Sequence, residues 1–146
     1  MRRFKFSLES VLIIRQKKLE DERIALAKII NVLNKQTDVL NEMLYVYNSF
    51  VQQRELQSFE ENVNPMIIAN YGAYCSKMVD DIKTQEKIIS LTQKDIERQQ
   101  QVVKEAYINV KSLENLKEKQ KEEYNQEQLQ EEIKIIDDIV NSKRSA

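Results

Sequence analysis

The sequence has almost none of the residues that make turns. Its 146 residues include a single glycine, Gly72, and a single proline, Pro65. Strands, hairpins and phosphate-binding loops depend on Gly, Pro and Asn-Gly turns. The abundant Glu, Lys, Gln, Leu and Ile are instead good helix formers or residues of helix seams. The composition therefore predicts long helices and excludes a Gly-rich phosphate loop.

The sequence has few side chains of the kinds that catalyse reactions or bind metal ions: it has no histidine and a single cysteine. Without imidazole there are no His general bases, Ser-His arrangements or His-based metal sites. The lone Cys75 allows no intrachain disulfide and no thiolate metal site, and it fits a reducing compartment as a small residue of a helix seam. The pairs Glu122-Glu123 and Asp137-Asp138 are expected on a solvated helix surface. We therefore predict no catalytic, cofactor or metal site, and a protein that is not an enzyme.

No segment has the features of a signal peptide or a membrane span. The basic opening, residues 1–5, is followed by an apolar run of only four residues, Val11 to Ile14, which Arg15 ends. That run is too short for a signal peptide, and a membrane span needs about 20 apolar residues. The expectation is a soluble, cytoplasmic protein, with peripheral membrane contact left open.

Charge is distributed unevenly along the chain although the formal net charge is only −1. Residues 1–28 carry eight basic and four acidic side chains, whereas residues 111–138 carry five lysines and nine acids. Segments of opposite sign attract when they lie side by side. The small net charge gives no argument for nucleic acid as a partner.

Two rows of apolar residues recur with a spacing of seven. A sustained period of seven is typical of a coiled-coil seam rather than of one face of a globular helix. Ile29, Met43 and Phe50 occupy the companion position of the first row, which Arg15, Glu22 and Gln36 weaken. The first row is Leu12, Leu19, Leu26, Leu33 and Leu40, and the second is Ile82, Ile89, Ile96, Val103 and Val110.

The break between the rows predicts a chain that folds back on itself. Pro65 removes a donor and disfavours helical geometry at Asn64. We predict an all-α protein, a long two-helix antiparallel coiled-coil hairpin in one domain, with helices over about 5–58 and 67–141 and a bend at about 60–66. Pairing Leu40 with Ile89 also pairs Leu33 with Ile96, but rows of period seven match again when they slide by seven.

The second helix is longer than the first and leaves an overhang after about residue 130. The overhang carries Ile133, Ile135, Ile136, Ile139 and Val140. Burying several isoleucines at about 25 cal/mol per Å² is a substantial part of a binding free energy. The overhang is therefore expected to bind a partner, with fold-back, fraying or dimerisation as the alternatives.

Aromatic residues cluster around the predicted bend. A two-stranded coil cannot bury them all, and exposed aromatic clusters favour binding surfaces. The alternative is an aromatic plug that closes this end of the hairpin. The cluster consists of Tyr45, Tyr47, Phe50, Phe59, Tyr71 and Tyr74.

Both ends of the chain carry a short sequence motif. The N-terminal motif consists of Phe4-Lys5-Phe6, Leu8, Val11-Leu12 and Arg15. The C-terminal motif consists of the stretch 113–120, Tyr124, Glu127 and the acidic pair before Ile139. Together the two motifs resemble the ends of the flagellar export protein FliJ family. The family often has Glu at the second position of that pair, where this chain has Asp138.

The resemblance implies a cytoplasmic component of the flagellar type III export machinery, associated peripherally with the membrane and similar to the central stalk of rotary ATPases. Its partners would be the export ATPase hexamer, the membrane export gate and export chaperones, with no small-molecule substrate. The residues expected to face the ATPase are Arg2, Arg3, Phe4, Phe6, Leu8, Ile133, Ile136 and Val140. Those expected to face the gate are Tyr45, Phe59, Tyr71 and Tyr74.

Three other functions fit the same residues. The stalk of a virulence type III secretion system shares the architecture, and genomic neighbours would separate the two. A parallel leucine-zipper scaffold fits the Leu12 to Leu40 row, but it would be a dimer in light scattering. A tentacle-like holdase chaperone would suppress the aggregation of client proteins.

Overall fold

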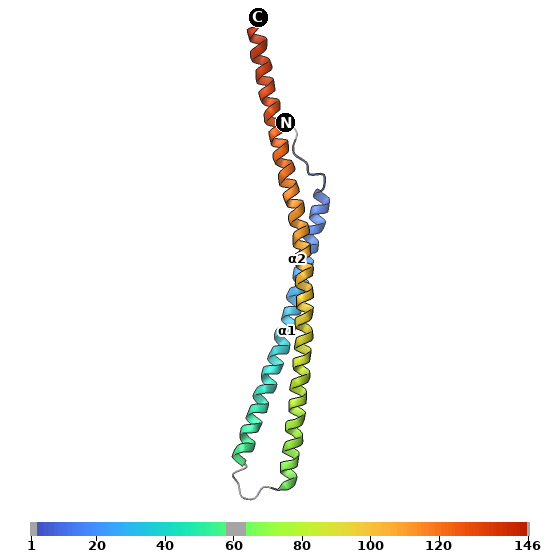
Figure 1. Cartoon of the computed structure of the whole chain (residues 1–146), viewed down its shortest axis with the longest axis vertical. Coiled ribbons are helices and arrows are strands. Elements are labelled where there is room, and N and C mark those ends of the chain that lie inside the picture. Colours follow the sequence, from blue (N-terminus) through green and yellow to red (C-terminus); the bar gives the residue numbers. More distant parts are fainter. Residues whose placement is uncertain (1–2, 58–63, 146) are drawn as a thin grey trace. The chain divides into compact units, whose positions relative to one another are not determined.

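Two long α-helices account for almost all of the chain that the structure describes. The computed structural model describes residues 3–57 and 64–145. Over these residues it holds helix α1 (Glu9–Gln57), helix α2 (Pro65–Arg144) and no strand (Figure 1). The two helices pack against each other, which confirms the predicted all-α helical hairpin. Most of the predicted bend, together with Phe59, lies outside the described residues.

Helix α2 begins at Pro65, inside the range predicted for the bend. Asn64 caps the helix, because its side-chain Oδ1 accepts a hydrogen bond from the Met66 N–H at 3.0 Å. The Asn64 carbonyl also accepts hydrogen bonds from the N–H groups of Ile67 and Ile68. Proline suits the first helical position, where its missing donor costs nothing. Pro65 therefore starts a helix instead of breaking one.

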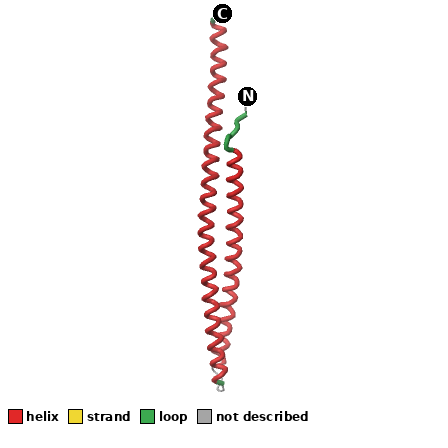
Figure 2. The backbone as a smooth tube through the Cα atoms, turned by 90° about the vertical axis from the view of Figure 1, so that its right-hand side faces the viewer, coloured by secondary structure: helices red, strands yellow, loops and turns green. Residues whose placement is uncertain are grey.

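The contacts divide the chain into two compact units, each built from a part of both helices. Unit 1 comprises residues 1–23 and 102–146, and unit 2 comprises residues 24–101. The helices run antiparallel in each unit (Figure 2). In unit 1, Phe4 contacts Tyr124 and Glu9 contacts Lys117. In unit 2, Gln36 contacts Gln85, and Phe50, further along α1, contacts Tyr71, further back along α2.

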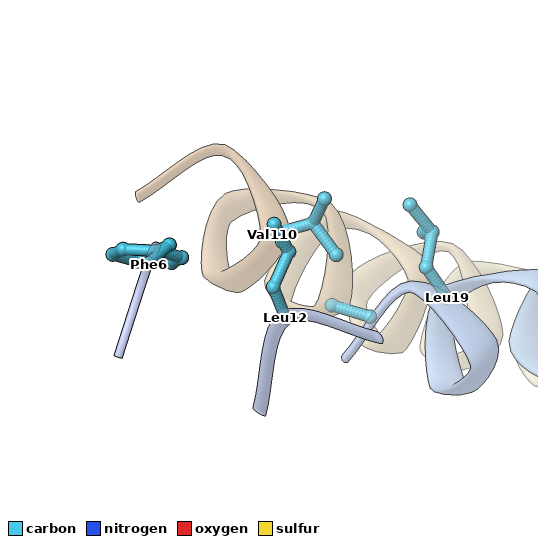
Figure 3. Close-up of a cluster of buried hydrophobic side chains, with 5 residues drawn as sticks. Phe6, Leu12, Leu19 and Val110 are labelled. Atoms are coloured by element: carbon cyan, nitrogen blue, oxygen red, sulfur yellow. The ribbon is translucent and has the colours of Figure 1, made fainter. Parts of the chain in front are cut away.

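Unit 1 has a small apolar core close to the start of α1. Leu12 and Leu19 of α1 are buried with Ala106 and Val110 of α2, and Figure 3 shows Leu12 beside Val110. Phe6 completes the core from the segment that precedes α1, and it is only 7% exposed. Helix α1 therefore begins at Glu9 and not at about residue 5, because residues 4–8 lead into the helix while their apolar side chains pack on it.

The seam of unit 2 mixes apolar and polar side chains. Ile82 is buried in it, and so are Gln85 and Thr92, each less than 10% exposed. On α1, Leu26, Leu33 and Leu40 are half-buried. The Thr92 hydroxyl donates a hydrogen bond to the Ile88 carbonyl of its own helix, whereas Gln85 reaches across to α1.

The cross-helix hydrogen bond of Gln85 fixes the pairing of the two rows in unit 2. Its Nε2 donates to the main-chain carbonyl of Gln36 at 2.9 Å. Leu33 lies three residues before Gln36, and Ile89 lies four residues after Gln85, so this contact sets Leu33 opposite Ile89. By the same spacing it sets Leu40 opposite Ile82. The pairing of Leu40 with Ile89 predicted from the sequence is therefore shifted by one seven-residue repeat. Both pairings satisfy the apolar rows, so the observed register is read from this contact and not from the rows.

Candidate protein-binding surfaces

The structure divides the terminal residues predicted to bind a partner into buried and exposed groups. Phe6 lies in the core of unit 1, and Phe4 and Leu8 are partly buried against it. The ring of Phe4 also packs on Tyr124, with 5.8 Å between the ring centroids. Arg3 is exposed, and Arg2 lies outside the described residues. The three apolar residues therefore hold the N-terminal segment on α2 rather than presenting themselves at the surface.

An ion pair joins the first turn of α1 to α2 at the same place. Lys117 Nζ lies 2.8 Å from a Glu9 carboxylate oxygen. Both side chains are more than a third exposed, so the pair adds little to stability. Its carboxylate sits at the first residue of α1, where the helix dipole favours a negative charge. The pair helps to orient the start of α1 on α2.

The C-terminal end of α2 carries an apolar surface that nothing in the described chain covers. Every residue from 129 to 145 is exposed, and α2 continues past the N-terminal end of α1 (Figures 1 and 2). We call residues 129–145 the overhang. Its large apolar side chains are Leu129, Ile133, Ile135, Ile136, Ile139 and Val140, each between 42% and 59% exposed.

Four of these residues form a regular stripe, which we call the overhang stripe. Leu129, Ile133, Ile136 and Val140 are separated by four, three and four residues, which is the spacing of a coiled-coil seam. At 3.6 residues per turn, the stripe lies roughly 150° around the helix axis from Tyr124. Tyr124 packs on Phe4, so the overhang stripe faces away from the side of α2 that holds the N-terminal segment. Ile135, eleven residues after Tyr124, is on the Tyr124 side.

Acidic side chains dominate the part of α2 that leads into the overhang stripe. Residues 122–138 hold seven acidic side chains and one basic side chain, Lys134, whereas Lys143 and Arg144 bring the overhang itself to four acidic and three basic side chains. A partner that combines an apolar surface with basic side chains opposite residues 122–138 would complement this segment.

In unit 2, the aromatic residues that were predicted to face a partner lie in different environments. Phe50 packs edge-on against Tyr71 and Tyr74, with ring centroids 5.2 and 4.9 Å apart. Tyr74 remains half exposed, and Tyr45 is 74% exposed. The cluster therefore combines a local aromatic plug with an exposed edge.

A groove of about 330 Å³ runs along unit 2 beside this aromatic cluster. Apolar side chains from both helices line it, and Glu42 and Asp81 supply negative charge. Val39 and Val46 belong to a row that includes Val32 and flanks the seam at the same spacing of seven. Positions that flank a two-stranded seam usually carry charge, so valines there indicate a surface suited to another helix. The lining residues are Val39, Glu42, Met43, Val46, Tyr74, Met78 and Asp81.

The groove was not predicted from the sequence, although the sequence contains a signal for it. The Val32, Val39 and Val46 row has the same period as the leucine row, but its residues lie beside the stronger leucine signal. The direction of the overhang stripe was also readable from the spacing of Leu129, Ile133, Ile136 and Val140. The packing of Phe4 on Tyr124 was not, because it depends on the N-terminal segment folding back on α2.

The remaining chemistry of the described residues is sparse. No group of three or more His, Cys, Asp or Glu side chains within residues 3–57 and 64–145 is arranged to hold a metal ion. Cys75 lies half-buried on the line of the second apolar row, 4.0 Å from Arg54 Nη1. Neither helix, over the same residues, has a stretch apolar and uncharged enough to cross a bilayer.

The fold and the surfaces define a class: an all-α antiparallel coiled coil with an unpartnered apolar end and an apolar groove along its side. A comparison with family models identifies the family, because the model described as flagellar FliJ protein matches residues 4–144. The chain therefore belongs to the FliJ family, and its function lies in flagellar type III protein export. No curated protein and no solved structure matches it.

Proposed function

We propose that this protein is a cytoplasmic stalk and adaptor of the flagellar type III export apparatus. Its terminal end binds the export ATPase ring, and unit 2 binds the export gate. In this role it couples the ATPase to the export of substrates, escorts export chaperones, and associates with the membrane only through the apparatus. Membership of the FliJ family supports the setting. The uncovered apolar surface of the overhang supports the mode of action.

The overhang stripe is the observation that carries the proposal. Exposing several isoleucines to water is unfavourable for the isolated protein. Burying them against an apolar partner stabilises a complex. Burying the exposed half of one isoleucine stabilises a complex by about 1 kcal/mol. Ile133, Ile136 and Val140 of the stripe supply most of the contact. Arg2 and Arg3 stay candidates for a separate, charged contact with the same partner. Phe4, Phe6 and Leu8 contribute by holding the N-terminal segment in place.

The gate contact is assigned to the groove of unit 2. Tyr74 lines the groove, and Phe50 holds it in place from the seam. Tyr71 also packs on Phe50, while Tyr45 is open to solvent on α1. An amphipathic helix with apolar side chains at seam spacing and basic side chains at its flanks would fit between Glu42 and Asp81. Phe59 stays a candidate outside the described residues.

The ATPase contact is tested with two neighbouring isoleucines that are equally exposed. Ile135 and Ile136 are both 59% exposed, but only Ile136 belongs to the overhang stripe. Ile136→Asp loses apolar burial and places a charge in the contact, so it should weaken binding to the export ATPase by tenfold or more, on the order of 1.4 kcal/mol. Ile135→Asp is the matched control and should bind almost normally. Binding is measured by titration, with stimulation of ATP hydrolysis as the second readout.

The two variants test the overhang stripe and the terminal contact separately. Equal loss in both variants would keep the overhang as the contact and contradict the assignment to the stripe. Normal binding by both, together with normal binding after charge reversal of Arg2 and Arg3, would contradict the terminal contact itself. Circular dichroism checks that both variants keep the helix content of the parent protein.

A further inference from the structure

One side of the unit 2 seam carries a largely apolar row on each helix. The row on α1 lies directly beside the leucine row, and its valines are between 44% and 48% exposed. The row on α2 has the same spacing of seven, and its tyrosine and isoleucine are 50% and 40% exposed. Members of both rows line the groove, so the two rows border the same side of the seam. We call this side the valine face; its rows are Val32, Val39 and Val46 of α1 and Tyr74, Asp81 and Ile88 of α2.

The opposite side of the seam differs on α2. Glu86 follows the seam residue Ile82 by four positions, whereas Asp81 precedes it by one, so the two acids flank the seam on opposite sides. The row of Glu86 continues with Gln93 and Gln100, and all three side chains are exposed. Exposed apolar side chains from both helices therefore meet on the valine face, which is suited to packing against further helices.

Two oppositely charged side chains border the valine face at nearly the same level. Glu42 on α1 and Lys77 on α2 each follow a member of the apolar row of their helix by three residues. The hydrogen bond from Gln85 to the Gln36 carbonyl sets Glu42 level with Val79. Lys77 is two residues from Val79, a difference of about 3 Å along the helix. Both charged side chains are exposed, and no ion pair joins them within the described part of the chain.

The signs are reversed at the next two levels along the valine face. Lys35 and Lys28 stand one and two repeats from the glutamate on α1, and the row on α2 supplies Asp81 and Asp95. The same register places Lys35 about one and a half turns from the level of Asp81. It places Lys28 two residues from the level of Asp95. Among the described residues, Asp95 pairs with Arg98 of its own helix at 3.6 Å, and the other three charges form no ion pair.

A second copy of the same chain complements this pattern. A two-fold axis parallel to the helices lays α1 of each copy on α2 of the other and leaves every level unchanged. The valines of one copy then pack on Tyr74 and Ile88 of the other. Glu42 of each copy faces Lys77 of the other, and the two lysines of α1 face the two aspartates of α2. Each contact occurs twice, and neighbouring helices run antiparallel, as in a four-helix bundle.

Asp81 limits the strength of this pairing. It belongs to the apolar row itself, so the pairing takes its carboxylate partly out of water, which is costly. Lys35 of the second copy offsets part of the cost, because its long side chain reaches the carboxylate from the border of the face. We therefore expect a dimer that dissociates on dilution.

We propose that the valine face binds a second copy of this chain, and that unit 2 of the two copies forms a four-helix bundle. The pairing follows from the residues of unit 2 and does not depend on the export role. It covers the groove. In the role proposed above, a second copy and the export gate therefore compete for one surface, and the dimer dissociates before the gate binds.

Exchange of charges between copies tests the arrangement. Glu42→Lys sets lysine against Lys77 twice in each dimer, and Lys77→Glu sets glutamate against Glu42 twice. Each variant alone should dimerise about tenfold less tightly than the parent protein. An equimolar mixture of the two variants restores both opposite-charge contacts in a mixed pair and should dimerise as tightly as the parent. Sedimentation equilibrium over a range of concentrations at low ionic strength, where exposed charges are least screened, measures the dissociation constants.

Two isoleucines of equal exposure test the apolar part of the contact. Ile88 belongs to the valine face, whereas Ile30, four residues after the seam residue Leu26, lies on the other side of the seam. Both are 40% exposed. Ile88→Lys places a charge among the valines and lysines of the second copy and should weaken the dimer more than tenfold. Ile30→Lys is the matched control and should dimerise like the parent, with circular dichroism showing that both variants keep their helix content.

Three outcomes would overturn the pairing. A parent protein that stays monomeric at all concentrations would show that the valine face does not bind a second copy. A mixture of the two charge variants that dimerises as weakly as each variant alone would contradict the two-fold arrangement. Equal weakening by Ile30→Lys and Ile88→Lys would move the contact off the valine face. The gate contact fails separately, because a protein that dimerises as expected but never binds the gate contradicts only that contact.

Discussion

At the scale of single residues, Gly72 shows that one glycine does not interrupt a long helix. Gly72 lies in α2 with no positive φ, and a Cβ added there would meet no atom within 4 Å. The backbone conformation therefore does not require glycine. The sequence marked Gly72 as a possible break, but one glycine costs a helix only about 1 kcal/mol, which the neighbouring turns offset.

Gly72→Ala should stabilise the protein. Alanine lowers the conformational entropy of the unfolded chain and is favoured in a helix interior by roughly 0.5–1 kcal/mol. Urea unfolding followed by circular dichroism should show a higher midpoint with an unchanged slope. A lower midpoint would mean that the space beside Gly72 is needed by Tyr71 or Tyr74, and Gly72→Ser would then lower it as well.

At the scale of the helices, composition and period were sufficient to predict two long helices, but the details depended on single polar contacts. Pro65 looked like the centre of a bend because proline disfavours helix in the residue before it. It is the first residue of α2, because Asn64 accepts the hydrogen bond that a helix start needs. The register likewise is read from the contact of Gln85 with the Gln36 carbonyl, because the leucine row fits two registers.

Asn64→Ala removes the cap of α2 and should destabilise unit 2 by roughly 1 kcal/mol, whereas Asn64→Asp should retain most of the stability. The Met66 N–H loses its acceptor in the first variant and keeps one in the second. Thermal unfolding of the two variants beside the parent measures the difference. Equal stability of Asn64→Ala and the parent would show that water satisfies this N–H equally well.

The candidate surfaces were predictable to different degrees, because the sequence gives the order of residues along a helix but not their contacts in space. The overhang followed from counting, because helices of unequal length leave one end without a partner. Deciding which of its residues share one face required the angle of 100° between neighbouring residues of a helix. The groove required knowledge of which positions flank the seam in space. Phe6 was assigned to a surface because its burial depends on how the N-terminal segment folds back on the helices.

At the scale of the whole molecule, the overhang should contribute to binding and almost nothing to folding. Residues 129–145 bury no side chain, so they lack the tertiary packing that supplies most of the stability of a helix in a protein. A chain ending at residue 128 should therefore keep the melting temperature of the full chain, because it retains Tyr124 and the core around Leu12. It should lose only the helical signal of the deleted residues.

The same truncated chain should fail to stimulate the export ATPase, since the overhang stripe is gone. Differential scanning calorimetry and a steady-state ATPase assay on one preparation make the comparison direct. A marked fall in melting temperature would show that the overhang packs on the rest of the chain, and its apolar face would then be structural. Full stimulation at an unchanged melting temperature would instead move the contact to the basic N-terminal segment, where Arg3 is exposed.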